Sequence, residues 1–176
     1  MRRIVMPSAG SLAEADHVLG HELVHAFQYD MSSRARGQGF LRLPLWFVEG
    51  LAEYLSLGPV DSQTAMWLRD ALAADRLPTL RDLGNPRFFP YRFGHAFWAY
   101  VGGPWSDETA VELFREGMRT GDPEAAIRKV LETGEKEFSL EWGEAIRKAY
   151  AGLLEAKKAP SAYGPLLVGE KRGGAS

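Results

Sequence analysis

The stretch of residues 15–29, ADHVLGHELVHAFQY, contains the pattern His-Glu-x-x-His at residues 21–25. On a helix, His21 and His25 would lie on one face about one turn apart, where both imidazoles can bind one metal ion. Glu22 follows the first histidine, so its carboxylate can reach a water molecule at that metal. The flanking apolar residues have helical spacing and predict a buried amphipathic helix rather than a surface helix; they are Val18, Leu19, Leu23, Val24, Ala26 and Phe27.

A second segment, residues 44–58 with the sequence PLWFVEGLAEYLSLG, carries two glutamates four positions apart. Pro44 suits the first turn of a helix, so this segment is expected to be helical. A catalytic zinc ion needs three protein ligands and one open coordination position, so the two histidines require a third ligand. Glu49 and Glu53 would share one side of this helix. One carboxylate can then bind the metal while the other accepts a hydrogen bond from a ligating imidazole. The alternative is that both are solvated on an exposed face, but the aromatic and glycine residues around them are untypical of such a face.

Together, the segments HELVHAFQYD at 21–30 and PLWFVEGLAEYLSLG at 44–58 resemble the gluzincin metallopeptidases. The signature of that group is His-Glu-x-x-His plus a downstream glutamate ligand. More closely, the chain is similar to the peptidase-like domains that precede TolB-type β-propellers in some bacterial secreted or envelope proteins. This resemblance extends from Arg3 to about Tyr150 and includes FPYRFGHAFWAYVGGPW at 89–105.

The resemblance implies a role for each residue of the two segments. It makes His21, His25 and Glu49 the ligands of one Zn²⁺ ion per chain and Glu22 the general base. It makes Glu53 a carboxylate that does not bind the metal itself but contacts one of the ligating side chains. It also implies a periplasmic or secreted location in a bacterium, a peptide or protein substrate, and a C-terminal β-propeller in a longer parent protein.

We expect a zincin-like α+β fold that is predominantly helical. Residues 2–6 are predicted to form a short strand, which in gluzincins edges the active-site sheet and can pair with an extended substrate. The alternative is an edge strand without a substrate role. The strands that precede it in the family are missing from the sequence, which indicates a fragment or a trimmed domain.

Downstream, the pattern predicts helices and a tail. The helices are expected at residues 61–75, 78–83 with Gly84 ending the turn, 91–101, 107–119 with Ser106 as cap, 122–132 and 139–154. We therefore expect a metallopeptidase domain at residues 1–156. Residues 157–176 are rich in proline and glycine and read as a linker.

Composition agrees with one globular domain and excludes several classes of protein. The 176 residues are 45% hydrophobic and 25% charged, which is ordinary for a folded domain. The net charge of −2 argues against general nucleic-acid binding, and the absence of cysteine excludes disulfides and a thiolate zinc site. No apolar run approaches the ~20 residues that a membrane span needs. Near the N-terminus, Pro7 interrupts an apolar run too short for a signal peptide.

The remaining histidines and tyrosines are candidates for smaller roles. His17 precedes His21 by one turn and is expected to cap the helix or support a ligand, because the resemblance already supplies three ligands. Gluzincins commonly stabilise the oxyanion with a tyrosine or histidine beyond the glutamate helix. Tyr91, at a loop-to-helix junction after Pro90, is the preferred donor, with His95 as the next candidate and as a candidate for substrate contact. Tyr54 and Tyr100 are expected to pack in the core.

These patterns predict zinc-dependent hydrolysis of peptide bonds, with Glu22 moving the proton. One alternative is a catalytically inactive zinc-binding module used for protein interaction, which the missing strands favour and the intact Glu22 disfavours. Hydrolysis of a non-peptide amide is a further alternative.

Overall fold

Helices form almost all regular structure in the part of the chain that the computed structural model describes, residues 10–34, 39–156, 162 and 164. The α-helices are α1 (Leu12–Arg34), α2 (Leu45–Leu57), α3 (Ser62–Ala73), α4 (Pro90–Gly102), α5 (Asp107–Thr120), α6 (Pro123–Val130) and α7 (Glu135–Ala156). Two 3₁₀ turns, η1 (Gly39–Arg42) and η2 (Arg81–Gly84), lie in the connections. The predominantly helical fold is confirmed. The described residues contain no β-strand, and the predicted strand at 2–6 lies outside them.

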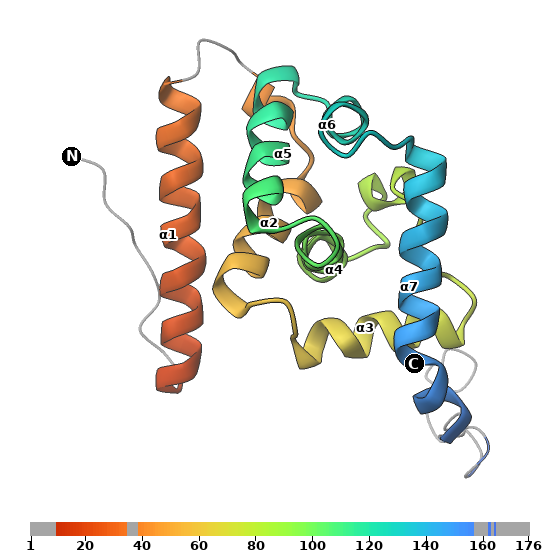
Figure 1. Ribbon diagram of the computed structural model, residues 1–176. Helices are drawn as coiled ribbons and strands as arrows, with labels where there is room; N and C mark the ends of the chain where they lie inside the picture. Colours follow the sequence, from red (N-terminus) through yellow and green to blue (C-terminus); the bar gives the residue numbers. More distant parts are fainter. Residues whose placement is uncertain (1–9, 35–38, 157–161, 163, 165–176) are drawn as a thin grey trace, which may run out of the picture.

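Helix α4 lies at the centre of the molecule and is seen end-on in Figure 1, with α2, α3, α5 and α7 around it. Its most extensive contact is with α2. Gly50 of α2 faces Gly94 of α4 at the crossing, where a Cβ added to Gly50 would lie 2.4 Å from the Gly94 carbonyl carbon. The lack of a side chain at both positions therefore lets the two backbones touch.

Aromatic side chains fill the space around this crossing. The indole nitrogen of Trp98 donates a hydrogen bond to the carbonyl oxygen of Phe47 at 2.9 Å, so its polar atom is satisfied inside the core. The rings of Phe47 and Phe114 stack at 5.7 Å, which connects α2 to α5. Each such buried aromatic side chain contributes roughly 1.5–3 kcal/mol to stability. The fully buried aromatic residues are Phe47, Phe97, Trp98, Phe114, Phe138 and Trp142.

Helix α1 stands at the edge of the molecule and packs chiefly against α2. The expectation that its apolar residues are buried is wrong. Leu19, Leu23 and Phe27 are 43%, 41% and 67% exposed, Ala26 is exposed too, and Val18 and Val24 are half-buried. The residues of α1 that are buried are His21 and Gln28. The physical reason is that the histidine-bearing face of α1 is the one turned toward α2, which leaves the apolar face outward.

The cap predicted at Ser106 is present, and Asp61 and Asp122 cap two further helices. Asp61 accepts a hydrogen bond from the backbone of Thr64 at 2.7 Å, and Ser106 and Asp122 cap α5 and α6 in the same way. Helix α7 begins at Glu135, earlier than the expected Ser139. The turn expected at 78–83 begins only at Arg81, and Gly84 ends it as the last residue of η2. Within the described residues, no helix is long and apolar enough to cross a membrane.

Candidate metal centre

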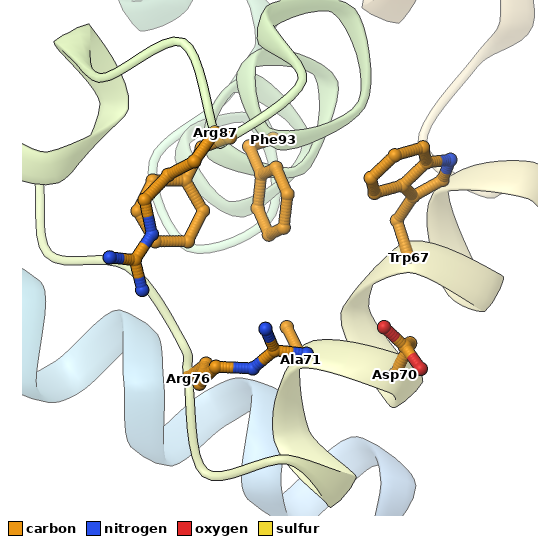
Figure 2. A pocket seen from close by; sticks show the side chains of 7 residues that line it. Trp67, Asp70, Ala71, Arg76, Arg87 and Phe93 are labelled. Carbon is orange, nitrogen blue, oxygen red and sulfur yellow. The ribbon is translucent and has the colours of Figure 1, made fainter. Parts of the chain in front are cut away.

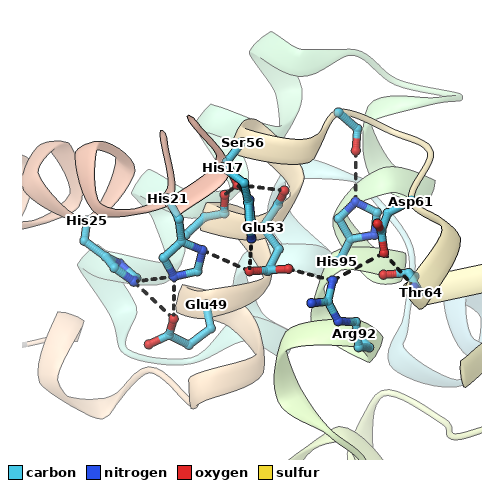
Figure 3. A network of polar contacts seen from close by, with 12 residues as sticks. His17, His21, His25, Glu49, Glu53, Ser56, Asp61, Thr64, Arg92 and His95 are labelled. Carbon is cyan, nitrogen blue, oxygen red and sulfur yellow. Dashed lines mark hydrogen bonds and ion pairs between the residues drawn. The ribbon is translucent and has the colours of Figure 1, made fainter. Parts of the chain in front are cut away.

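Three side chains from α1 and α2 converge on one point, as Figure 3 shows. The Nε2 atoms of His21 and His25 lie 3.0 Å apart, and each is 3.1 Å from Oε2 of Glu49. Ligands of a tetrahedral zinc ion at about 2.0–2.1 Å would lie roughly 3.3 Å from one another. The donor set and its spacing therefore fit a zinc ion held by two imidazoles and one carboxylate.

The tautomer of His25 follows from its neighbour Gln28, a fully buried residue of the same helix. The amide nitrogen of Gln28 donates to the carbonyl oxygen of Val48 at 3.0 Å, so its amide oxygen must face the other way. That oxygen lies 2.8 Å from Nδ1 of His25 and accepts a hydrogen bond from it. In a neutral His25, Nε2 therefore carries the free lone pair and points at the other two ligands.

Glu53 plays the corresponding part for His21. Its Oε1 lies 3.0 Å from Nδ1 of His21 and 3.4 Å from Nε2 of His17, while its Oε2 lies 2.8 Å from the Arg92 guanidinium. Asp61 holds Arg92 from the other side at 3.3 Å. A carboxylate fixed in this way orients His21 so that Nε2 faces Glu49. His17 thus contacts the carboxylate that supports His21, which agrees with the expected supporting role.

The electrostatics of the cluster favour a positive charge between the ligands. Burial lowers the pKa of His21, but hydrogen bonds to Glu49 and Glu53 outweigh it and raise the pKa to about 9. Burial raises the pKa of Glu49, but the two histidines lower it to about 2. These pKa shifts favour a protonated His21 beside a charged Glu49, and a divalent cation would compete with that proton.

Glu22 and two of the three converging side chains, His25 and Glu49, line one cavity. This cavity has a volume of about 320 Å³ and is open to solvent beside Glu22, His25 and Glu49. The Glu22 carboxylate, which the sequence predicts to be the general base, therefore faces the same space as His25 and Glu49. The rest of the wall is apolar or aromatic and consists of Tyr29, Phe40, Leu43, Leu45 and Val48.

Tyr91 lies beside the cluster in the first turn of α4. Its ring stacks on the ring of His21, with a centroid separation of 6.0 Å and an angle of 20° between the planes. Burial and the nearby Glu49 carboxylate raise the pKa of its hydroxyl. Tyr91 therefore stays protonated near neutral pH and can donate a hydrogen bond next to the ligands.

His95 does not lie where substrate contact would require. Its side chain is 1% exposed, and Nε2 donates a hydrogen bond to the carbonyl oxygen of Gly58 at 2.9 Å. Burial lowers its pKa, so the imidazole is a neutral core group that connects α4 to the end of α2. The two tyrosines expected in the core do pack: Tyr54 is buried and donates to Asp107, and the ring of Tyr100 lies against Phe138.

Reasoning from the sequence missed Gln28 and the pair of Arg92 and Asp61. Gln28 follows His25 by three residues, so its position on the histidine face was a usable signal. Arg92 and Asp61 come from other elements, and no spacing in the sequence connects them to Glu53.

Comparisons with protein-family models, with curated proteins and with solved structures found no match. The function is therefore argued from the chemistry of the site.

Proposed function

We propose that this protein is a zinc-dependent hydrolase that cleaves peptide bonds at the His21, His25 and Glu49 cluster. The observation that carries the proposal is the convergence of these three donor atoms at about 3 Å, beside a cavity that Glu22, His25 and Glu49 line. When bound there, zinc would polarise a substrate carbonyl and lower the pKa of a water molecule.

The protein's own residues would carry out the proton transfers. Glu22 takes a proton from the attacking water and passes it to the leaving amine, which is general base and then general acid catalysis. The Tyr91 hydroxyl donates a hydrogen bond to the carbonyl oxygen as negative charge develops on it. Gln28 and Glu53 keep the two imidazoles in the tautomer that presents Nε2 to the metal.

The walls of the cavity favour a peptide with an apolar side chain next to the cleaved bond. Phe40, Leu43 and Val48 line the space beside Glu49, and burial of an apolar side chain against them would favour binding. A peptide is also a better fit than a small polar amide, because the cavity is open and can continue along the surface.

One observation favours a second candidate, a zinc-binding module that presents a partner-binding surface without catalysis. Helix α1 exposes a row of apolar side chains on the face away from α2, consisting of Leu12, Leu19, Leu23 and Phe27. A row of this kind is typical of a helix that contacts another protein.

The experiment that separates the two candidates compares variants on a diverse peptide mixture. The zinc-loaded protein is expected to cleave peptides, and Glu22→Gln is expected to keep zinc while losing at least about 10²–10⁴-fold in rate. Glu112→Gln makes the same chemical change on the exposed side of α5 and serves as the control. Equal cleavage by Glu22→Gln would overturn the mechanism, and absence of cleavage by the zinc-loaded protein would favour the binding module.

A further inference from the structure

A second cavity, of about 270 Å³, lies between α3, the first turns of α4 and the segment that connects them (Figure 2). Its inner wall is aromatic, with Phe88 and Phe93 buried and Trp67 38% exposed. Figure 2 shows Phe93 and Trp67 on neighbouring sides of the cavity, and their rings meet edge to face with a centroid separation of 6.3 Å. Together they form one aromatic wall against which a flat or branched apolar group could pack.

The cavity also carries an excess of positive charge. Arg76 and Arg87 line it, and neither forms an ion pair with another described residue. The Arg87 guanidinium lies 4.9 Å from the centre of the Phe88 ring, a cation–π contact that holds the charge at the cavity wall. Asp70 is the acidic residue of the lining, so the lining itself holds two arginines and one carboxylate. The Asp82 carboxylate also lies near Arg87, whose charge helps to lower the pKa of Asp82.

A row of aromatic rings connects this cavity to the metal cluster. From His21 the row runs to Tyr91 at 6.0 Å, to Phe89 at 5.3 Å and to Trp67 at 5.5 Å. Phe89 is 40% exposed, so the row is accessible between its ends. About five residues of extended peptide, at ~3.3 Å each, span this path.

We propose that the cavity between α3 and α4 binds an apolar side chain that carries a neighbouring carboxylate, and that this group is the distal part of the peptide substrate. The apolar part packs against the wall formed by Trp67 and Phe93, and the carboxylate pairs with Arg87. Guanidinium groups are suited to this because they offer several donors to one carboxylate. The link to the substrate rests on the proposed function, whereas the binding chemistry of the cavity does not.

Binding of small probes tests the cavity directly. N-acetylphenylalanine is expected to shift the indole N–H resonance of Trp67, identified in NMR spectra with Trp67→Phe, and its uncharged amide to bind at least about fivefold more weakly. The α-amide of N-acetyl-phenylalanyl-aspartic acid, blocked at the main-chain carboxyl only, carries the charge on a side chain. Whichever of the two acids binds more tightly identifies a chain terminus or an acidic side chain as the source.

Two variants should change the affinity for the acid in opposite directions. Arg87→Gln is expected to weaken the binding of N-acetylphenylalanine about 5–10-fold without affecting the binding of the amide. Asp70→Asn is expected to strengthen the binding of N-acetylphenylalanine about twofold or more. Arg128→Gln, on the exposed side of α6, serves as the control and should change nothing. Equal affinities for acid and amide, or an unchanged affinity in Arg87→Gln, would overturn the proposal.

The link to the metal cluster is tested with the hexapeptide N-acetyl-Ala₅-Phe on the Glu22→Gln protein. Zinc is expected to increase the affinity of the protein for the hexapeptide but not for N-acetylphenylalanine, because only the longer chain reaches both sites. An affinity for the hexapeptide that zinc does not change would overturn the link. If the proposed hydrolysis fails instead, binding of N-acetylphenylalanine measured after zinc is removed still reports on the cavity.

Discussion

Gln28 accepts a hydrogen bond from Nδ1 of His25 at 2.8 Å, and the bond that its amide makes to Val48 leaves it no other orientation. One buried side chain therefore sets the tautomer of a candidate metal ligand and joins α1 to the residue that precedes Glu49. The two helices that carry the ligands are thus aligned by the same group that orients one of them.

Gln28→Met should weaken zinc binding about 10–100-fold, because it removes the acceptor that orients His25. Gln28→Glu keeps an acceptor for His25, so it should retain more zinc affinity than Gln28→Met. It loses the donor to Val48, so its melting temperature should be lower than that of the parent protein. Competition with a chelator and thermal unfolding measure the two effects. Gln63→Met, an exposed position of α3, is the control, and zinc affinity in Gln28→Met equal to that of the parent would refute the role.

Replacing the ligands and replacing their supports should have different consequences. His21→Ala, His25→Ala and Glu49→Ala should each abolish stoichiometric zinc, while Glu53→Ala should cost about 10–100-fold in affinity. Arg92→Met should act in the same direction as Glu53→Ala, since Arg92 holds that carboxylate at 2.8 Å. Metal content after dialysis checks this, and full zinc occupancy in Glu49→Ala would place the third ligand elsewhere.

Zinc affinity and the stability of the zinc-free protein should respond to pH in opposite ways. The pKa of His21 is about 9 when folded and 6.5 in its ordinary state, so its proton stabilises the zinc-free fold below pH 6.5, and this contribution is lost as the pH rises toward 9. Zinc must displace that proton, so its apparent affinity should rise by up to about tenfold per unit between pH 6.5 and 8. Titrations with zinc and unfolding curves measure both, and a zinc affinity independent of pH would contradict the assignment. The charged and titratable groups that face His21 are His17, His25, Glu49, Glu53, Tyr91 and, through Glu53, Arg92.

Tyr91→Phe should lower kcat for peptide hydrolysis by about 10²–10³-fold, because it removes the hydroxyl that would stabilise the oxyanion. Zinc content and melting temperature should change little, since the ring that stacks on His21 remains. Tyr100→Phe is the matched control, as Tyr100 lies in the core against Phe138. An unchanged kcat in Tyr91→Phe would assign the donor role to another group.

Gly50→Ala should lower the free energy of unfolding by about 1–3 kcal/mol, although alanine ordinarily favours a helix by ~1 kcal/mol. The added Cβ would meet the backbone of Gly94, which cannot move without separating α2 from α4. Gly143→Ala is the control, because its Cβ would meet the flexible end of the Arg147 side chain. Denaturant unfolding should show the first variant destabilised and the second unchanged or more stable.

Relations within one helix could be predicted from the sequence, because the helical repeat determines which side chains share a face. The pairing of His21 with His25, the caps at Asp61 and Ser106, and most helix boundaries follow from spacing alone. These features depend on residues a few positions apart, whose geometry is the same in any fold.

Relations between helices were decided by the tertiary structure. Which face of α1 meets α2 determines that the histidines are buried and Phe27 is exposed, and periodicity cannot say which of two faces is covered. The contact of Arg92 with Glu53 and the burial of His95 depend on how α4 crosses α2, which the Gly50–Gly94 contact sets. The sequence by itself predicted two imidazoles spaced for one metal ion and a neighbouring carboxylate, and the resemblance added Glu49. Only packing between helices far apart in the chain brought Glu49 to the two histidines and placed Arg92 against Glu53.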